Sequence, residues 1–167
     1  PKGEVTYNDL VAVLPFNNTL CKASLTGQQL LDALEMSVRW LPYEYGEFMQ
    51  VSGMSFKVDS TVVSPVVMGE DGLFSHVADA PRRVSELKIL NKESGEYRPV
   101  ELEKRYTLAG LSYQIKALGS QGIFRYAVLE EDNLGQDVEI LASYLEKHLG
   151  GKIGKEYSHT DGRIEIK

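Results

Sequence analysis

The clearest pattern in the chain is a helix that begins after Thr26. Thr26 and Gln29 have the spacing of a capping box, in which two side chains satisfy the free backbone N–H groups of a first helical turn. Apolar residues then recur every three or four positions until a Leu-Pro pair ends the run. These positions are Leu30, Leu31, Leu34 and Val38. A second helix is predicted near 136–149, where apolar residues again share one face and two glycines follow.

Alternating and continuous apolar runs predict the strands. The segments 11–16 and 19–25 flank two asparagines and predict a strand, a tight turn and a second strand. Residues 60–83 hold two short apolar runs around a Gly-Glu-Asp-Gly turn and predict a peripheral hairpin. The segment 106–111 is almost wholly apolar, which favours a central strand. Further strands are predicted at 51–58, 84–90, 98–103 and 162–167.

The rest of the chain adds a short helix at 113–118 and a loop at 119–122. The sequence contains no repeat, no low-complexity linker and no break in composition. Its 167 residues suit one domain with a real core. The sequence therefore predicts a single α+β domain over residues 1–167, with a mixed β-sheet packed against two main helices.

Composition excludes some classes of partner. The apolar content of 43% and the charged content of 25% are ordinary for a globular protein. The net charge of -6 argues against a broad electrostatic surface for nucleic acid or an anionic membrane. No apolar run approaches the roughly 20 residues that cross a bilayer. No signal peptide is visible, but the chain starts at Pro1 and is interpreted as a piece of a longer protein.

Candidate catalytic residues are few. Cys21 is interpreted as a small core residue on a strand, because no histidine lies nearby to activate a thiol. His148 falls in the last turn of the second helix, where a cation interacts well with the helix dipole. His159 with Asp161 is a weak metal-ligand pair, and the acidic run 130–132 is interpreted as a solvated face. The residues alone indicate a domain without a self-contained active site.

Residues 5–38, VTYNDLVAVLPFNNTLCKASLTGQQLLDALEMSV, resemble the C-terminal domain of the 5′-nucleotidase family. This family includes bacterial UDP-sugar hydrolases and 2′,3′-cyclic-nucleotide phosphodiesterases. The shared pattern is a leading strand, Pro-Phe, a Gly or Asn, an Asn, a second strand, and Leu-Thr-Gly at a helix start. The resemblance covers almost the whole chain, because it continues through 46–59, 82–90, 104–122 and 161–166.

The resemblance implies a division of labour between two domains. In this family a separate N-terminal metallophosphoesterase domain holds two divalent metal ions, and the C-terminal domain supplies the substrate pocket. The chain would then bind a nucleotide or nucleoside and would have no catalytic residue or metal of its own. It would be inactive alone, and its whole protein would be an extracytoplasmic hydrolase of nucleotide catabolism.

Five positions are identified as site residues by matching the family pattern. Phe16 and Tyr113 match the two aromatic residues that clamp the base. Asn18 matches a residue that hydrogen-bonds the base edge, and Gly46 matches a glycine whose backbone approaches the base. Without the resemblance, Phe16 would be interpreted as a core residue, because an aromatic at a strand end usually packs inward.

The fifth position, Ser120, departs from the family pattern. The family has Gly-Gly-Asp-Gly here, and its aspartate contacts the ribose hydroxyls, whereas this chain has Leu-Gly-Ser-Gln. A serine has one hydroxyl and no charge, so it cannot accept two hydrogen bonds as a carboxylate does. This difference leaves an alternative open, in which the chain is a non-catalytic binding or surface-interaction domain that kept the fold and lost nucleotide recognition.

Overall fold

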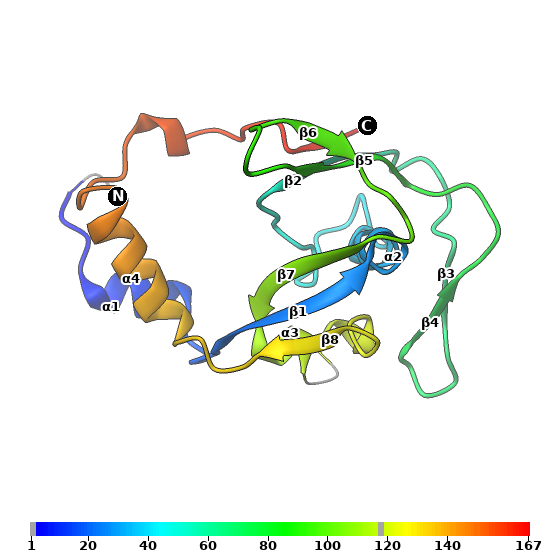
Figure 1. Cartoon of the computed structure of the whole chain (residues 1–167), viewed down its shortest axis with the longest axis horizontal. Coiled ribbons are helices and arrows are strands. Elements are labelled where there is room, and N and C mark those ends of the chain that lie inside the picture. The colour runs from blue at the N-terminus through cyan, green and yellow to red at the C-terminus, as the bar shows by residue number, and fades with distance from the viewer. Residues whose placement is uncertain (1–2, 117–118) are drawn as a thin grey trace.

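The computed structural model describes residues 3–116 and 119–167, and its strands form three sheets (Figure 1). The first sheet is antiparallel, and its central strand is flanked on both sides. In the order β7-β1-β8, its strands are β7 (Arg105–Leu111), β1 (Leu20–Thr26) and β8 (Val128–Glu131).

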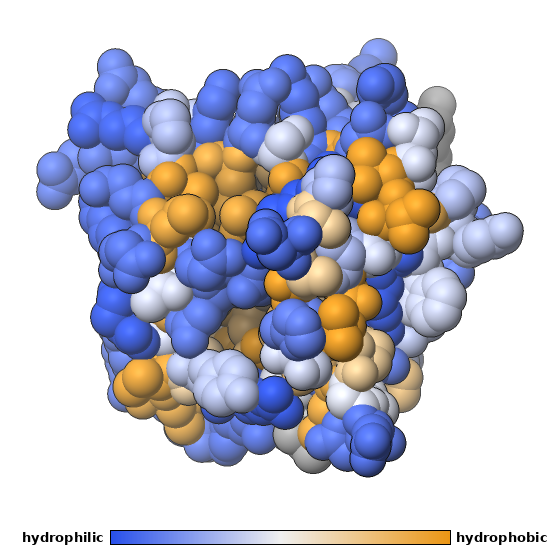
Figure 2. Space-filling model, turned by 90° about the vertical axis from the view of Figure 1, so that its right-hand side faces the viewer, coloured by the Kyte–Doolittle hydropathy of each residue, from blue (hydrophilic) through white to orange (hydrophobic). Residues whose placement is uncertain are grey.

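The second sheet is mixed, because its C-terminal strand runs parallel to a neighbour while the other pairs are antiparallel. In the order β6-β5-β2-β9, its strands are β6 (Tyr97–Pro99), β5 (Val84–Leu90), β2 (Met54–Val58) and β9 (Ile164–Ile166). The third is a hairpin of β3 (Val66–Met68) and β4 (Phe74–Val77). Figure 2 faces the end with this hairpin, where apolar side chains reach the surface in separate patches among polar ones.

Helix α2 (Gly27–Ser37) lies among the three sheets and contacts β1, β4 and β5 (Figure 1). Its predicted capping box is confirmed. Gln29 donates its backbone N–H to Thr26 Oγ1 over 3.2 Å, and Thr26 donates its own to Gln29 Oε1 over 2.8 Å. A Cβ at Gly27 would lie 2.8 Å from the side chain of Val100, so the helix start packs closely against the chain before β7. The fully buried core includes Cys21, Leu25, Leu34, Val38 and Val58.

The remaining helices lie at the edges of these sheets. α1 and α4 pack side by side at the end of the molecule opposite the β3–β4 hairpin (Figure 1). Among the described residues, the helices other than α2 are α1 (Tyr7–Val13), α3 (Ser112–Ile115) and α4 (Asp137–Lys147), and the two 3₁₀ turns are η1 (Gly119–Gly122) and η2 (Lys155–Tyr157). The predicted single α+β domain is confirmed, as are the helix near 136–149, the hairpin in 60–83 and the core position of Cys21.

The strand predicted at 11–16 is wrong, because the chain forms α1 before the two asparagines. Thr6 caps this helix with Asp9: Thr6 N donates to Asp9 Oδ2 over 2.7 Å, and Asp9 N donates to Thr6 Oγ1 over 3.4 Å. The apolar residues of α1 stay partly or largely exposed. The capping box thus marks the start of a helix here, and α1 packs against α4.

The position predicted for 106–111 is also wrong. β7 is an edge strand of its sheet, and β1 is the central strand between β7 and β8. The acidic run predicted as a solvated face contributes Glu130 and Glu131 to β8. Their carboxylates lie 3.5 and 2.7 Å from Lys22 Nζ on β1, so a cross-strand cation favours pairing there.

Candidate functional site

The two asparagines lie where three elements meet. Thr19, next to Asn18, accepts a hydrogen bond through its carbonyl from the backbone N–H of Ser112, the first residue of α3, over 2.7 Å. Asn18 accepts one from the N–H of Asp137, the first residue of α4, over 2.9 Å. Asn17 has a φ of 50°, a left-handed conformation that asparagine tolerates. These bonds fix the turn at one end of the β1–β7 pair.

The two predicted aromatic residues are both exposed at this end. Phe16 is 82% exposed and Tyr113 is 61% exposed. They lie on the two segments that the bond between Thr19 and Ser112 joins. Phe16 is therefore not a core residue, and both rings are available to a ligand.

Tyr113 also packs against the start of η1. A Cβ at Gly119 would lie 2.8 Å from Cε1 of the Tyr113 ring and would meet the Tyr113 carbonyl more closely still. Only glycine fits there without a shift, so the glycine keeps the ring against the backbone of η1. Ser120 follows in η1, but its side chain lies outside the described residues.

Gly46 lies in an exposed loop after α2, and nothing approaches the position of a Cβ on it within 4 Å. Its two neighbours are held by Arg39, whose Nη2 lies 3.2 Å from Tyr45 Oη and 3.0 Å from Glu47 Oε2. The same nitrogen donates to Gln121 Oε1 in η1 over 2.8 Å. Arg39 was not predicted as a site residue, because a single arginine after an apolar helix gives no local signal of these contacts.

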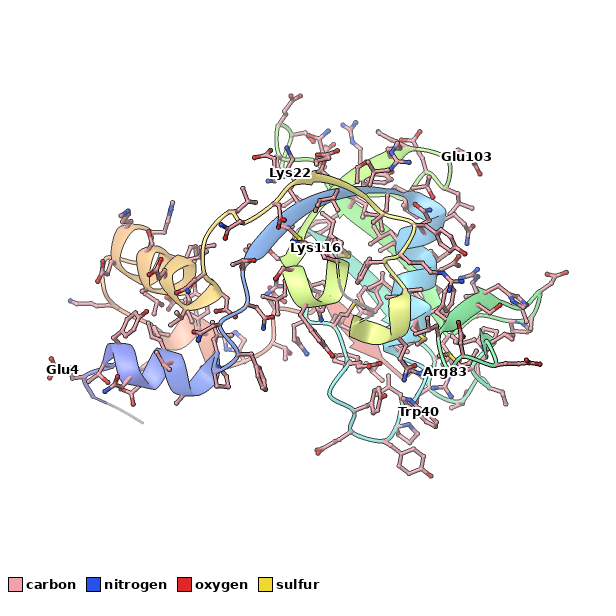
Figure 3. The ribbon with its side chains drawn as sticks, turned by 90° about the horizontal axis from the view of Figure 1, so that it is seen from below. Glu4, Lys22, Trp40, Arg83, Glu103 and Lys116 are labelled. Carbon is pink, nitrogen blue, oxygen red and sulfur yellow. The ribbon has the colours of Figure 1, made fainter. Side chains whose placement is uncertain are left out.

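Charged pairs border β8 on the side of α3. Lys116, at the end of α3, lies 2.5 Å from Asp132 Oδ2, and the hydrogen bond from this lysine lowers the pKa of Asp132. The hydrogen bond to Glu131 raises the pKa of Lys22. Figure 3 shows Lys22 and Lys116 beside the segment that contains β8. Both lysines therefore have carboxylate partners in this structure.

Two hollows lie next to each other on the surface, and the first borders the loop that contains Gly46. One of about 360 Å³ is lined by Trp40, Tyr43 and Tyr45, together with Phe48. The other, of about 390 Å³, shares Phe48 and extends to the chain before β9. Trp40 is visible on its loop in Figure 3. None of the five predicted site residues lines either hollow, but Tyr45, next to Gly46, lines the first.

Within residues 3–116 and 119–167, no three His, Cys, Asp or Glu side chains gather closely enough to hold a metal ion.

His148 lies at the C-terminal end of α4 and stacks on Tyr144, with 5.4 Å between the ring centroids. In the same described ranges, no helix is long and apolar enough to cross a membrane.

Comparison with known proteins finds that the chain is similar to 5′-nucleotidases. The family model described as 5′-nucleotidase, C-terminal domain, matches residues 1–129. The 5′-nucleotidase of Rattus norvegicus is 28% identical over 167 residues, covering 98% of this chain and 25% of the relative. The trifunctional nucleotide phosphoesterase protein YfkN of Bacillus subtilis is 28% identical over 164 residues, covering 98% of this chain and 10% of that protein.

Solved structures give the same picture. The crystal structure of a 5′-nucleotidase precursor from Thermus thermophilus aligns with a TM-score of 0.76 and 28% identity, over 99% of this chain and 28% of that one. The NAD nucleotidase of Haemophilus influenzae shares the fold, with a TM-score of 0.68 and 18% identity over 98% of this chain and 27% of that one. The chain thus spans about a quarter of the length of the rat and Thermus thermophilus proteins and a tenth of that of YfkN.

Proposed function

The chain belongs to the 5′-nucleotidase C-terminal domain family, and from this membership we propose that it is the substrate-binding and specificity domain of a metal-dependent nucleotide phosphohydrolase. The relatives named above are hydrolases in which this domain is part of a longer chain. The two divalent metal ions belong, in this proposal, to an N-terminal metallophosphoesterase domain outside these residues. An extracytoplasmic location is part of the same proposal.

In the proposed complex, Phe16 and Tyr113 stack on the two faces of the base. The observation that supports this most directly is their exposure on two segments joined by a backbone hydrogen bond. An aromatic ring left in water gains contact area when a planar ligand covers it. Base stacking contributes about 1–3 kcal/mol per base and tolerates different bases. Such a pair would select for a base without selecting strongly among bases.

The other predicted positions would act at the rim of this stack. The Asn18 side chain would contact the base edge. Its backbone carbonyl accepts a hydrogen bond from the start of α4, which holds the residue in place. Gly46 would offer an unobstructed backbone. Ser120 would contact the ribose through one hydroxyl, which gives a weaker contact than the family aspartate. This loss also motivates the alternative, a binding or surface-interaction domain without nucleotide recognition.

The test is a calorimetric titration of the intact protein, with every segment that its gene encodes. We expect saturable binding of adenosine and of AMP, and weaker binding of ribose 5-phosphate, which has no base to stack. Hydrolysis of AMP, UDP-glucose and cyclic nucleotides is measured in parallel with manganese, cobalt or zinc. Absence of both nucleoside binding and turnover would contradict the proposal and favour the alternative.

A further inference from the structure

We infer that Arg39 is a positioning residue of the nucleoside site, because its guanidinium holds the Gly46 loop (residues 43–47) against η1. Its contact with Gln121 would thereby set the distance between two parts of the site. This inference rests on the proposed function, since it assigns to Arg39 the placement of segments that bind the nucleoside.

The guanidinium of Arg39 is buried and uses both of its terminal nitrogens. Nη1 donates to the carbonyl of Met36 over 2.9 Å, which ties the side chain to the last turn of α2. Nη2 faces Tyr45 Oη, Glu47 Oε2 and Gln121 Oε1, all within 3.2 Å. The residue is only 9% exposed, and its charge lies 4.9 Å from the centroid of the Tyr45 ring. A planar donor group with several acceptors has little freedom to move.

The backbone of Gln121, the other partner in this contact, has an unusual conformation. Gln121 has a φ of 53°, a left-handed conformation that glycine adopts far more readily than a residue with a side chain. Its amide oxygen nevertheless lies 2.8 Å from Arg39 Nη2, in a partly buried setting. A glutamine therefore stands where the backbone conformation favours glycine, and its side chain contacts Arg39.

The contact reaches both halves of the proposed site. Gln121 and Gly119 belong to the single turn of η1, and Gly119 lies against the ring of Tyr113. On the other side, Arg39 binds the residues on either side of Gly46. A loss of the contact would let the Gly46 loop and the Tyr113 ring shift relative to each other. The two would then no longer meet one base in the same geometry.

Two substitutions separate this role from a general contribution to stability. Arg39→Lys keeps the charge but removes the planar fork that contacts several acceptors at once. Gln121→Gly removes the amide and suits the backbone conformation, so the variant should stay folded. Arg105→Lys is the control for loss of an arginine fork away from the site, because the exposed Arg105 donates to Ser24 at the opposite end of the β1–β7 pair.

The experiment measures the adenosine Kd by calorimetry, together with the unfolding midpoint, on the intact protein and each variant. We expect Arg39→Lys and Gln121→Gly each to weaken adenosine binding about tenfold. The double variant should bind adenosine no more weakly than Arg39→Lys alone, because Arg39→Lys already removes the contact with Gln121. Arg105→Lys should lower the unfolding midpoint and leave the Kd unchanged.

Three outcomes would overturn the inference. If the wild type binds adenosine and both single variants bind it equally well, the Arg39–Gln121 contact does not position the site, although the proposed function stands. If only Arg39→Lys weakens binding, Arg39 acts without Gln121 and the inference fails. If the wild type binds no nucleoside at all, the proposed function fails first. Should Arg39→Lys not fold, the Kd of Gln121→Gly decides the question.

Discussion

At the scale of single residues, the buried side chains of Glu35 and Arg83 hold the end of α2 and the residues just before the Gly46 loop in place. Glu35 on α2 is fully buried, and its carboxylate accepts the backbone N–H groups of Arg83 and Val84 over 2.9 and 3.0 Å. The Arg83 guanidinium donates to the carbonyls of Val38 and Leu41 just beyond α2, over 3.0 and 2.9 Å. Carbonyls at a helix end need such donors when water cannot reach them.

Arg83→Ala should therefore lower the free energy of unfolding by at least about 1–3 kcal/mol, because it leaves buried carbonyl acceptors without a donor. Urea unfolding followed by circular dichroism measures this change. Arg98→Ala is the control, since Arg98 on the edge strand β6 forms only an exposed pair with Glu96, and its removal should have no measurable effect. Equal losses in the two variants would contradict this account of Arg83.

Some of these residues were predictable and others were not. The position of Cys21 in the core followed from its place on a predicted strand and from the lack of a nearby histidine that could activate its thiol. The roles of Arg39 and Arg83 did not follow from any local pattern. Arg83 bonds to the carbonyl of Val38, which lies 45 positions earlier, and Arg39 bonds to Gln121, which lies 82 positions later. Partners this distant leave no periodic signal in the sequence.

At the scale of elements, short segments were the ones that sequence patterns assigned wrongly. The apolar run before the asparagines suits either a strand or a helix, because short runs do not distinguish the two periods. Thr6 and Asp9 provided the decisive capping signal for α1. β8 was not predicted, because its residues, Val128–Glu131, are exposed and half of them are acidic. It forms as the partner of a buried strand, which is information from the rest of the fold.

The pair of Lys116 and Asp132 joins α3 to the segment after β8, and its strength should depend on pH. The hydrogen bond from Lys116 lowers the pKa of Asp132 below the ordinary 3.8. A carboxyl whose pKa is lower in the folded state stabilises the fold above the unfolded pKa, and this contribution is lost as the pH falls through the folded pKa. The pair should therefore add stability above about pH 4 and none well below it.

Urea unfolding of the wild type and of Asp132→Asn from pH 6 to pH 2 measures this dependence. The wild type should be the more stable protein at pH 6, and the difference between the two should shrink as the pH falls below about 4. A difference that stays constant over the whole range would show that the ionised carboxylate does not stabilise the fold.

At the scale of the whole molecule, the proposed site is assembled from segments that are far apart in the sequence. The asparagine turn, the Gly46 loop and the segment from α3 to η1 meet through Thr19–Ser112 and Arg39–Gln121 contacts. The order of motifs in the sequence was enough to identify the family and the α+β fold. It could not give the exposure of each ring or the contacts between loops, because both depend on how the sheets pack.

The central claim is that two exposed rings bind a base, and substitution of each ring tests it most directly. Phe16→Ala and Tyr113→Ala are compared with Tyr97→Ala, an exposed aromatic on β6, for adenosine affinity and for stability in the intact protein. We expect each site variant to lose about 1–3 kcal/mol of adenosine binding, Tyr97→Ala to lose none, and the stability of all three to change little. Unchanged adenosine affinity in both site variants, or a loss of about 3–5 kcal/mol of stability as for a core aromatic, would contradict the claim.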